Sequence, residues 1–478
     1  MKNIGFSTIS LMACVVGVGA TRAMSQTVEA GDDKPMNVLF LLMDDVRWNS
    51  LHCMGTDYMI TPNIDKLAED GVLFENAYVT SGISCVSRAS LFTGQYMSRH
   101  GINKFGKELT PEQFENTYPA RLREAGYWTG LVGKYGVGVV RESDFDSSSV
   151  YDYLHWYPTD PKNKIVKLPG GYSRIEGDSI HVTRRNVKEA LEFLDDAPKD
   201  KPFCLNVGFY AAHADDLHPD QYRYQPSSES FYEDVTIPAP ESADDEYLKR
   251  LPFFLQDPQN EGRVRWHWRY DTPEKYQRMM KAYYRLITEI DIAVGEIVAR
   301  LKRDGLYENT LIICMGDNGY FHSEHQLADK WYPYLEAMRV PLIIYDPRVA
   351  KEDRGQRLEQ MVLNIDVPYT MLSAVGQEPP KAMQGEDLAD LYLRGRKEWR
   401  TDFYYEHPVI NSIDCIPNSE ALVSFDQKYV IWPYYEMEEY FDLKRDPIEV
   451  NNRIHDSHYR KKIEKARVRF EELKKRAE

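Results

Sequence analysis

Residues 37–43 read Asn-Val-Leu-Phe-Leu-Leu-Met, and the acidic pair Asp44 and Asp45 follows directly. An almost unbroken apolar run of this length is typical of a β-strand that is buried on both faces. Similar apolar runs stand further along the chain, at 203–210, 310–315 and 340–345. Segments with helical periodicity lie between the runs, the longest at about 274–303. This alternation predicts an α/β fold with a large, mostly parallel sheet sandwiched by helices.

The composition agrees with a large globular protein. The chain has 478 residues, of which 42% are hydrophobic and 12% aromatic, and this content excludes a disordered or low-complexity chain. The length allows two or three domains. The formal net charge of −16 argues against nucleic acid as a partner, because binding to phosphate backbones needs clustered positive charge.

We expect two structural parts in the mature chain. A large α/β domain is predicted over 36–395, and a smaller C-terminal α+β subdomain over 396–478. Short strand candidates occur in the second part, at 421–425, 429–433 and 439–441. A charged helix is predicted after them, at about 458–476. The subdomain should therefore be an antiparallel sheet with a terminal helix.

The N-terminus is typical of an export signal. Lys2 precedes a mostly apolar stretch over 4–20, and Ala23-Met-Ser25 is a small-x-small cleavage pattern. We therefore predict a signal peptide over 1–25 and a periplasmic or secreted protein. A lipoprotein attached through Cys14 is the alternative. No later stretch has 18 apolar residues in a row, so no transmembrane segment is expected in the mature chain.

Polar residues follow four of the predicted strands, one of them at 127–132, at the points where the strands end. These residues are Asp44 and Asp45, Lys134, His213, and Asp317 with Asn318. In parallel sheets, ligands bind at the carboxyl ends of the strands. Three carboxylates and an amide oxygen suit Ca²⁺ or Mg²⁺ better than zinc. Either acidic pair alone would be interpreted as an ordinary turn or helix cap, but both follow buried strands.

A second polar segment, at 84–94, reads Ser-Cys-Val-Ser-Arg-Ala-Ser-Leu-Phe-Thr-Gly and lies between a predicted strand and a helix start. Helix N-termini favour anionic groups, and a nucleophile beside a metal would gain from both. Taken alone, the segment is interpreted more simply as a serine-rich capped turn.

The same segment resembles the signature of formylglycine-dependent, arylsulfatase-like sulfatases of the alkaline-phosphatase-like superfamily. That signature is Cys or Ser, two residues, a small residue and Arg, closing with Thr-Gly. Ser84 stands four residues before Arg88, whereas Cys85 has the wrong spacing. The resemblance therefore implies a serine-type enzyme, in which a maturation enzyme oxidises Ser84 to formylglycine. Val86 departs from the family, which usually has Pro or Ala there.

The resemblance continues in the right order over about 37–451. It implies a Ca²⁺ site made by Asp44, Asp45, Asp317, Asn318 and residue 84. It further implies that Lys134, His213 and Lys330 contact the sulfate, and we expect His325, in the segment that supplies Lys330, to bind the substrate as well. Gly136 is a departure, because the family commonly has a histidine there that helps to collapse the sulfated intermediate. His325, a water molecule or Asp317 would then accept the proton, or the step is arranged differently.

The resemblance implies a sulfatase that acts on sulfate esters, and the acidic, aromatic-rich segments favour a sulfated carbohydrate as substrate. A hydrated formylglycine near Arg88 would attack sulfur, and His213 would protonate the leaving oxygen. One alternative is a phosphonate monoester or phosphodiester hydrolase of the same superfamily. The alternative from another class is a non-catalytic carbohydrate-binding relative with an unmodified Ser84.

Overall fold

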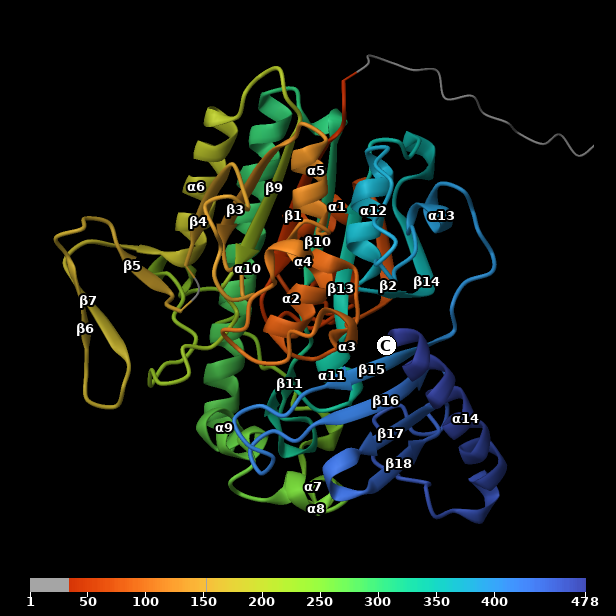
Figure 1. Cartoon of the computed structure of the whole chain (residues 1–478). Coiled ribbons are helices and arrows are strands. Elements are labelled where there is room, and N and C mark those ends of the chain that lie inside the picture. Colours follow the sequence, from red (N-terminus) through yellow and green to blue (C-terminus); the bar gives the residue numbers. More distant parts are fainter. Residues whose placement is uncertain (1–33, 152) are drawn as a thin grey trace, which may run out of the picture. The chain divides into compact units, whose positions relative to one another are not determined.

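The computed structural model describes residues 34–151 and 153–478, and Pro35–Glu478 form one compact unit. The predicted signal peptide, with Cys14, lies outside the described residues. The central feature is an eight-stranded sheet in the order β14-β2-β13-β10-β1-β9-β3-β4 (Figure 1). Its strands are β1 (Asn37–Met43), β2 (Val72–Tyr78), β3 (Trp128–Gly133), β4 (Ser147–Val150), β9 (Phe203–Phe209), β10 (Thr310–Gly316), β13 (Arg339–Tyr345) and β14 (Gln356–Leu363).

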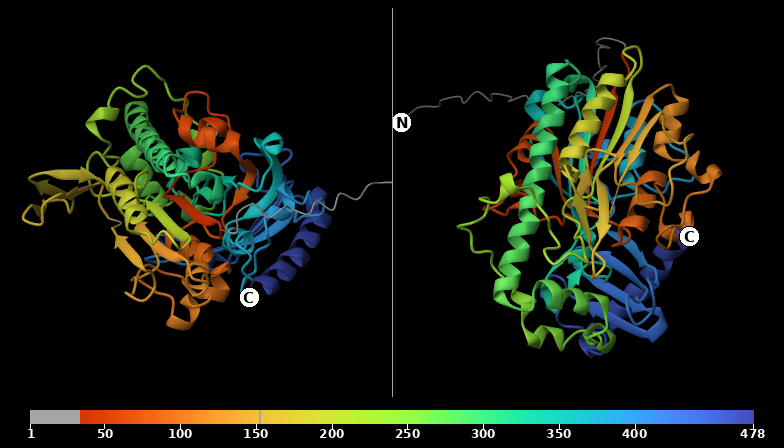
Figure 2. Two further views of the ribbon diagram at one scale, coloured as in Figure 1. Left: turned by 90° about the horizontal axis from the view of Figure 1, so that it is seen from above. Right: turned by 90° about the vertical axis from the view of Figure 1, so that its left-hand side faces the viewer.

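Strand β1 shows why helices cover both faces of this sheet. Its alternate residues enter two different cores, with Leu39 and Leu41 in one and Val38 and Phe40 in the other. The first core includes residues of α1 (Pro62–Asp70), α6 (Val182–Asp196) and α10 (Pro273–Arg303). The second includes residues of α2 (Ser84–Thr93), α5 (Tyr118–Glu124) and α12 (Asp366–Ala374). Figure 2 shows α6 and α10 side by side on one face. The predicted sandwich is confirmed.

The strand directions are parallel through the middle of the sheet. Strand β1 pairs in parallel with β10 and β9, and β9 pairs in parallel with β3. Strand β13 departs from this, because it runs antiparallel to both β10 and β2. The carboxyl ends of β1, β3, β9 and β10 therefore meet at one edge of the sheet.

The C-terminal part contains a four-stranded antiparallel sheet and a terminal helix, as predicted. The sheet is made of β15 (Asp402–His407), β16 (Ser419–Ser424), β17 (Lys428–Trp432) and β18 (Met437–Phe441), and α14 (Arg460–Ala477) follows it. Strand β15 was not predicted. A third core joins this sheet to the rest of the unit, since Ile83 and Val86 belong to it together with Leu422 and Phe470. The boundary at 395/396 stays a prediction.

Short elements fill the remaining connections. The segment 216–268 contains the helices α7 (Asp245–Leu248), α8 (Phe253–Gln256) and α9 (Glu261–Arg269). Two small antiparallel pairs precede α6, namely β5 (Trp156–Pro158) with β8 (Ser179–His181) and β6 (Lys164–Lys167) with β7 (Ser173–Glu176). The other elements are α3 (Met97–His100), α4 (Pro111–Phe114), β11 (Phe321–His322), β12 (Ala328–Asp329), α11 (Leu335–Met338) and α13 (Ala389–Tyr392). Within the described ranges, no helix combines the length and the apolar character needed to cross a membrane.

Candidate active site

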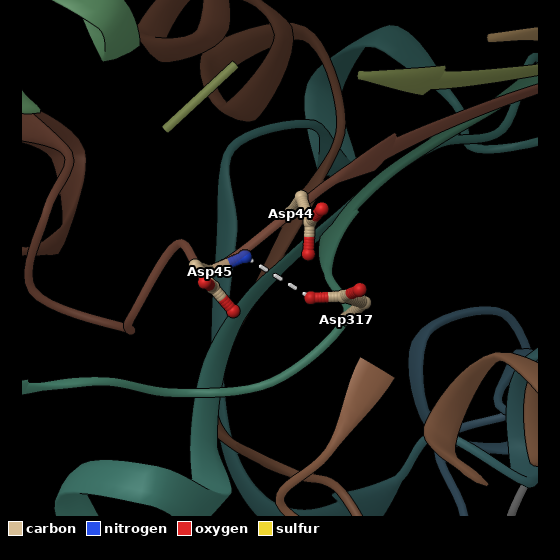
Figure 3. Close-up of side chains that lie close together, drawn as sticks. All are labelled: Asp44, Asp45 and Asp317. Carbon is tan, nitrogen blue, oxygen red and sulfur yellow. Dashed lines mark hydrogen bonds between the residues drawn. The ribbon is translucent and has the colours of Figure 1, made fainter. Parts of the chain in front are cut away.

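Three buried carboxylates converge where β1 and β10 end. Asp44 and Asp45 follow β1, and Asp317 follows β10. One oxygen of each lies within 4.8 Å of the others, and the Asp45 backbone N–H donates to Asp317 Oδ1 at 3.1 Å (Figure 3). Asp45 has a left-handed backbone conformation (φ 54°), which is uncommon for a residue with a side chain. The turn after β1 thus brings two adjacent acids to one place.

Asn318 and Ser84 complete the oxygen cluster. The Asn318 amide donates to Asp45 Oδ1 at 2.7 Å. Ser84 is the first residue of α2, and its Oγ lies 3.1 Å from both Asp44 Oδ1 and Asn318 Oδ1. Asp45 Oδ2 is buried and accepts no hydrogen bond from the described part of the chain. The cluster is therefore a set of hard oxygen donors in which one oxygen accepts no hydrogen bond from the described residues.

Cys85 is adjacent to Ser84 but has a different environment. Its side chain belongs to the third core, with Ile83 and Val86. Burial raises the pKa of the Cys85 thiol to about 11, so the thiol is protonated near neutral pH. Ser84, not Cys85, is thus hydrogen-bonded to the carboxylate cluster.

Three cations surround the carboxylates. Arg88 donates from Nε to Asp317 Oδ2 at 2.7 Å and from Nη1 to the Lys134 carbonyl at 2.8 Å. Lys134 pairs with Asp44, and Lys330 pairs with Asp45. Lys330 Nζ also lies 3.4 Å from Ser84 Oγ. Basic side chains that are predicted to contact sulfate therefore lie beside the predicted nucleophile.

The charges of the cluster influence one another strongly. Burial works to raise the pKa of Asp44, but Lys134 and other nearby cations outweigh it and hold that pKa below its usual range. Burial together with the Asp44 charge raises the pKa of Asp317 to about 6. Burial works to lower the pKa of Lys330, whereas Asp45 and Asp329 raise it above its usual value. The nearby cations therefore favour the ionised form of Asp44, whereas burial and the Asp44 charge disfavour the ionised form of Asp317.

His213 lies at the edge of this cluster. Its Nδ1 is 2.7 Å from the Ala214 carbonyl oxygen, so Nδ1 carries a proton and donates it. Its Nε2 is 3.8 Å from Asp45 Oδ2, and its ring stacks on Tyr210 with centroids 5.2 Å apart. Nε2 is therefore the nitrogen that faces the carboxylates.

His325 is not brought to the cluster, in contrast to the expectation. Its ring lies against Tyr334 with centroids 5.3 Å apart, and it is absent from the residues that line the cavity above Ser84. The reason is a tight reversal, because β11 pairs with β12 and His325 lies in the turn between them. Lys330 directly follows β12 and returns to the site. Burial lowers the pKa of His325 from its usual value.

A cavity of about 540 Å³ opens above Ser84, Lys134, His213 and Lys330. Its wall includes residues that were not predicted as site residues from the sequence, namely Tyr210, Asp216, Arg265, Asp329, Trp331 and Asn411. Tyr210 lay in the same short segment as His213, and Arg265 precedes the aromatic segment 266–270. Asn411 comes from the predicted C-terminal subdomain, and no local signal indicated it.

Comparisons with known proteins agree with this geometry. The family model described as Sulfatase matches residues 36–377, and the one described as N-sulphoglucosamine sulphohydrolase, C-terminal, matches residues 323–476. An arylsulfatase of Clostridium perfringens is 27% identical over 481 residues, with 92% of this chain and 95% of the relative covered. An N-acetylglucosamine-6-O-sulfatase of Bacteroides thetaiotaomicron is 25% identical, with 93% and 87% covered.

Solved structures share the fold. One is a complex of an enzyme with its substrate D-glucosamine-2-N,6-O-disulfate, with a TM-score of 0.76, 24% identity, and 93% of this chain and 98% of that chain covered. Another is a phosphonate monoester hydrolase of Agrobacterium radiobacter, with a TM-score of 0.76, 20% identity, and 93% and 96% covered. The similarity extends over both the large sheet and the C-terminal sheet.

Proposed function

The chain belongs to the sulfatase family of sulfuric ester hydrolases, and we propose that it removes sulfate from sulfated carbohydrates. The nucleophile is a formylglycine that a maturation enzyme forms from Ser84, and the metal is Ca²⁺. The observation that carries the proposal is the position of Ser84 Oγ, 3.1 Å from Asp44 and Asn318 and 3.4 Å from Lys330 Nζ. The signal peptide predicted over 1–25 implies a periplasmic or secreted enzyme.

The oxygen cluster fits a calcium ion. Asp44, Asp45, Asp317 and Asn318 offer only hard oxygen ligands, and residue 84 adds one more. The buried Asp45 Oδ2, which has no hydrogen-bond partner among the described residues, is then explained as a ligand. When bound, the ion supplies positive charge that acidifies a bound hydroxyl and neutralises charge on the substrate.

The basic side chains bind the sulfate group of the substrate. Lys134 and Lys330 lie where they can exchange their carboxylate partners for sulfuryl oxygens. Charge that develops on these oxygens in the transition state is stabilised by cations that are already in place. Arg88, held by Asp317 and by the Lys134 carbonyl, keeps the start of α2 and the Lys134 backbone together.

His213 is proposed as the proton donor to the leaving oxygen. Because Nδ1 donates to the Ala214 carbonyl, Nε2 is the nitrogen that delivers a proton to the substrate. His325 is left out of this proposal, because it lies in the turn between β11 and β12.

A phosphonate monoester or phosphodiester hydrolase is the alternative within the superfamily. The fold likeness to a phosphonate monoester hydrolase favours it, and two lysines at one tetrahedral anion serve phosphorus as well as sulfur. A non-catalytic carbohydrate-binding relative is the alternative from another class, and it requires an unmodified Ser84.

The test uses the full chain co-expressed with a serine-type maturation enzyme. A panel of sulfated mono- and oligosaccharides, an aryl sulfate, a phosphonate monoester and a phosphodiester is incubated with it, and free sulfate, phosphorus products and desulfated sugar are measured. We expect sulfate release from sugars to exceed turnover of the phosphorus esters. Lys134→Ala and Lys330→Ala should each lower kcat/KM by about 30- to 1,000-fold.

The matched control is Lys462→Ala, which removes a lysine that pairs with Asp442 in the C-terminal part. It should leave turnover unchanged. Faster turnover of a phosphorus ester would favour the first alternative, and binding of sulfated sugars without any turnover would favour the second.

A further inference from the structure

The wall of the cavity above Ser84 contains an arginine that is held in one orientation. Arg265 lies on α9, lines the same cavity as Ser84 and Lys330, and has a side chain only 16% exposed. Its Nη1 lies 2.7 Å from both Asp216 Oδ2 and Asp329 Oδ2, and its Nε lies 2.8 Å from Glu261 Oε1. The guanidinium also stands 5.2 Å from the centre of the Trp331 ring. A side chain fixed before binding loses little entropy when a ligand arrives.

This wall offers hydrogen-bond donors and acceptors that the described residues do not use. Arg265 uses Nε and Nη1 for the carboxylates, and its Nη2 bonds to no residue that the structure describes. Asp329 accepts from Arg265 and from Arg269 through Oδ2, while its buried Oδ1 has no hydrogen-bond partner among the described residues. A hydroxyl group, which both donates and accepts, matches this combination.

The charge of the wall disfavours a second anion. Asp216 and Asp329 each bind both Arg265 and Arg269, and Glu261 binds Arg265 as well. Within this network the three carboxylates outnumber the two guanidiniums, and the neighbouring Lys330 is already paired with Asp45. A carboxylate or a second sulfate placed here would meet net negative charge in a partly buried site, where repulsion is weakly screened. An uncharged ring carries no such penalty.

We propose that Arg265 is a specificity-determining residue. Together with Asp216, Glu261 and Asp329, it binds a hydroxyl of an uncharged sugar ring. This inference rests on the proposed sulfatase function, with the sulfate ester at Ser84. The enzyme then prefers monosulfated neutral sugars over sugars that carry a carboxylate or a second sulfate on the same ring. Phe105, 59% exposed and lining the cavity, adds an apolar surface for the face of the ring.

The experiment compares three kinds of substrate on the matured full chain. The first is a 6-sulfated neutral hexose or N-acetylhexosamine, the second a disulfated glucosamine or a sulfated uronic acid, and the third an aryl sulfate without sugar hydroxyls. Arg265→Gln and Arg265→Lys should lower kcat/KM on the neutral sugars by about 10- to 100-fold, mainly through KM, because a hydrogen bond to a charged group is lost. The aryl sulfate should lose much less.

Glu261→Gln is the complementary variant, because it removes one negative charge from the wall at almost constant shape. It should raise kcat/KM on the anionic sugars relative to the neutral ones. Arg300→Gln is the matched control, since Arg300 also pairs with two carboxylates, Asp195 and Asp304, but does not line the cavity. It should leave all three substrate classes unchanged.

The outcomes separate this inference from the proposed function. If neither the aryl sulfate nor any sugar sulfate is hydrolysed, the proposed function fails. If the aryl sulfate is hydrolysed but Arg265→Gln lowers all substrates equally, Arg265 has a structural role and the inference is overturned. A wild-type preference for anionic sugars also overturns it. Should Arg265→Gln not fold, as judged by its melting temperature, the Glu261→Gln comparison decides.

Discussion

Ser84 and Cys85 are neighbours in the chain, yet only the first is bonded to the acidic cluster. Ser84 Oγ lies 3.1 Å from Asp44 and from Asn318, whereas the Cys85 thiol packs in a hydrophobic core. Adjacent side chains at the start of a helix point in different directions, so both cannot face one metal. These contacts favour Ser84 over Cys85 as the modified residue, as does the spacing of Ser84 to Arg88.

The first prediction concerns this pair of residues. Ser84→Ala should lose nearly all turnover, because the residue that becomes the nucleophile is gone. Cys85→Ala, its matched control, should keep most activity, at a packing cost. Peptide mass spectrometry of the matured protein should find Ser84 lighter by about 2 Da, the mass of two hydrogens. An aldehyde on residue 85, or an active enzyme with unmodified Ser84, would contradict the assignment.

Gly136 departs from the family, and its backbone explains part of the difference. It has a φ of +77°, and a Cβ built there would lie 2.7 Å from Arg88 Cδ. Arg88 is fully buried and bonded to Asp317, so its side chain has little room to move. A larger residue at 136 therefore conflicts directly with Arg88.

The second prediction follows from that conflict. Gly136→His should lower kcat/KM by roughly 100-fold, because a displacement of about 1 Å at a catalytic site has that order of effect. Gly136→Ala should lose activity as well. Gly305→Ala is the control, since Gly305 has a similar φ of +69° but no atom within 4 Å of its Cβ position. A Gly136→His enzyme more active than wild type would refute the steric argument.

Among the elements, β15 contacts α3 through a buried glutamate. Glu406 on β15 accepts hydrogen bonds from the Ser98 backbone N–H at 2.8 Å and the Ser98 hydroxyl at 3.0 Å. Burial raises the pKa of Glu406 from 4.5 to about 7. The contact links the C-terminal sheet to the segment that follows α2, and the Ser98 hydrogen bonds only partly offset the effect of burial on the Glu406 pKa.

The third prediction concerns how Glu406 makes the free energy of unfolding depend on pH. Between about pH 4.5 and 7 the folded state keeps a proton on Glu406 that the unfolded chain has released. The free energy of unfolding therefore falls as pH rises through this window, by on the order of 3 kcal/mol for this group alone. Glu406→Gln keeps an acceptor for Ser98 and should reduce that fall, measured by urea unfolding at pH 5, 6, 7 and 8.

The control for this measurement is Glu471→Gln, on the exposed side of α14. It should follow the wild-type pH dependence. An identical pH dependence in the Glu406→Gln protein would show that the carboxyl does not titrate as expected.

In the whole molecule, the proposed metal joins segments that are far apart in sequence. Its ligands come from the turn after β1, the start of α2 and the turn after β10. Parallel pairing of β1 with β10 fixes the first and third beside each other. Ligand binding to the folded state alone stabilises that state.

The fourth prediction is that chelation lowers both activity and melting temperature. With free Ca²⁺ at about 100 times its dissociation constant, the stabilisation is about 3 kcal/mol, which is several degrees of melting temperature for a protein of this size. Ca²⁺ should restore both properties after chelation. Asp317→Ala should abolish turnover and the Ca²⁺-dependent shift. Asp402→Asn, which only breaks a pair with Arg469, should keep the shift. A wild-type protein indifferent to chelator would contradict the site.

The sequence by itself determined the large sheet and the main features of the site. In apolar runs such as 37–43, the side chains on both faces of the strand must be buried. A sheet covered by helices therefore follows from the local pattern of apolar residues. Residues that follow parallel strands meet at one edge of the sheet, and Asp44, Lys134 and Asp317 lie together there as expected. The spacing of Ser84 to Arg88 is also local.

Only the tertiary structure decided the remainder. The antiparallel direction of β13 depends on how the chain returns to the sheet, and an apolar run reads the same in both directions. His325 and Lys330 are five residues apart, but the reversal between β11 and β12 separates them. Arg265 reaches the cavity through α9, and two of its carboxylate partners, Asp216 and Asp329, come from other segments. Such contacts between distant segments leave no periodic signal in the sequence, because they depend on how whole elements pack.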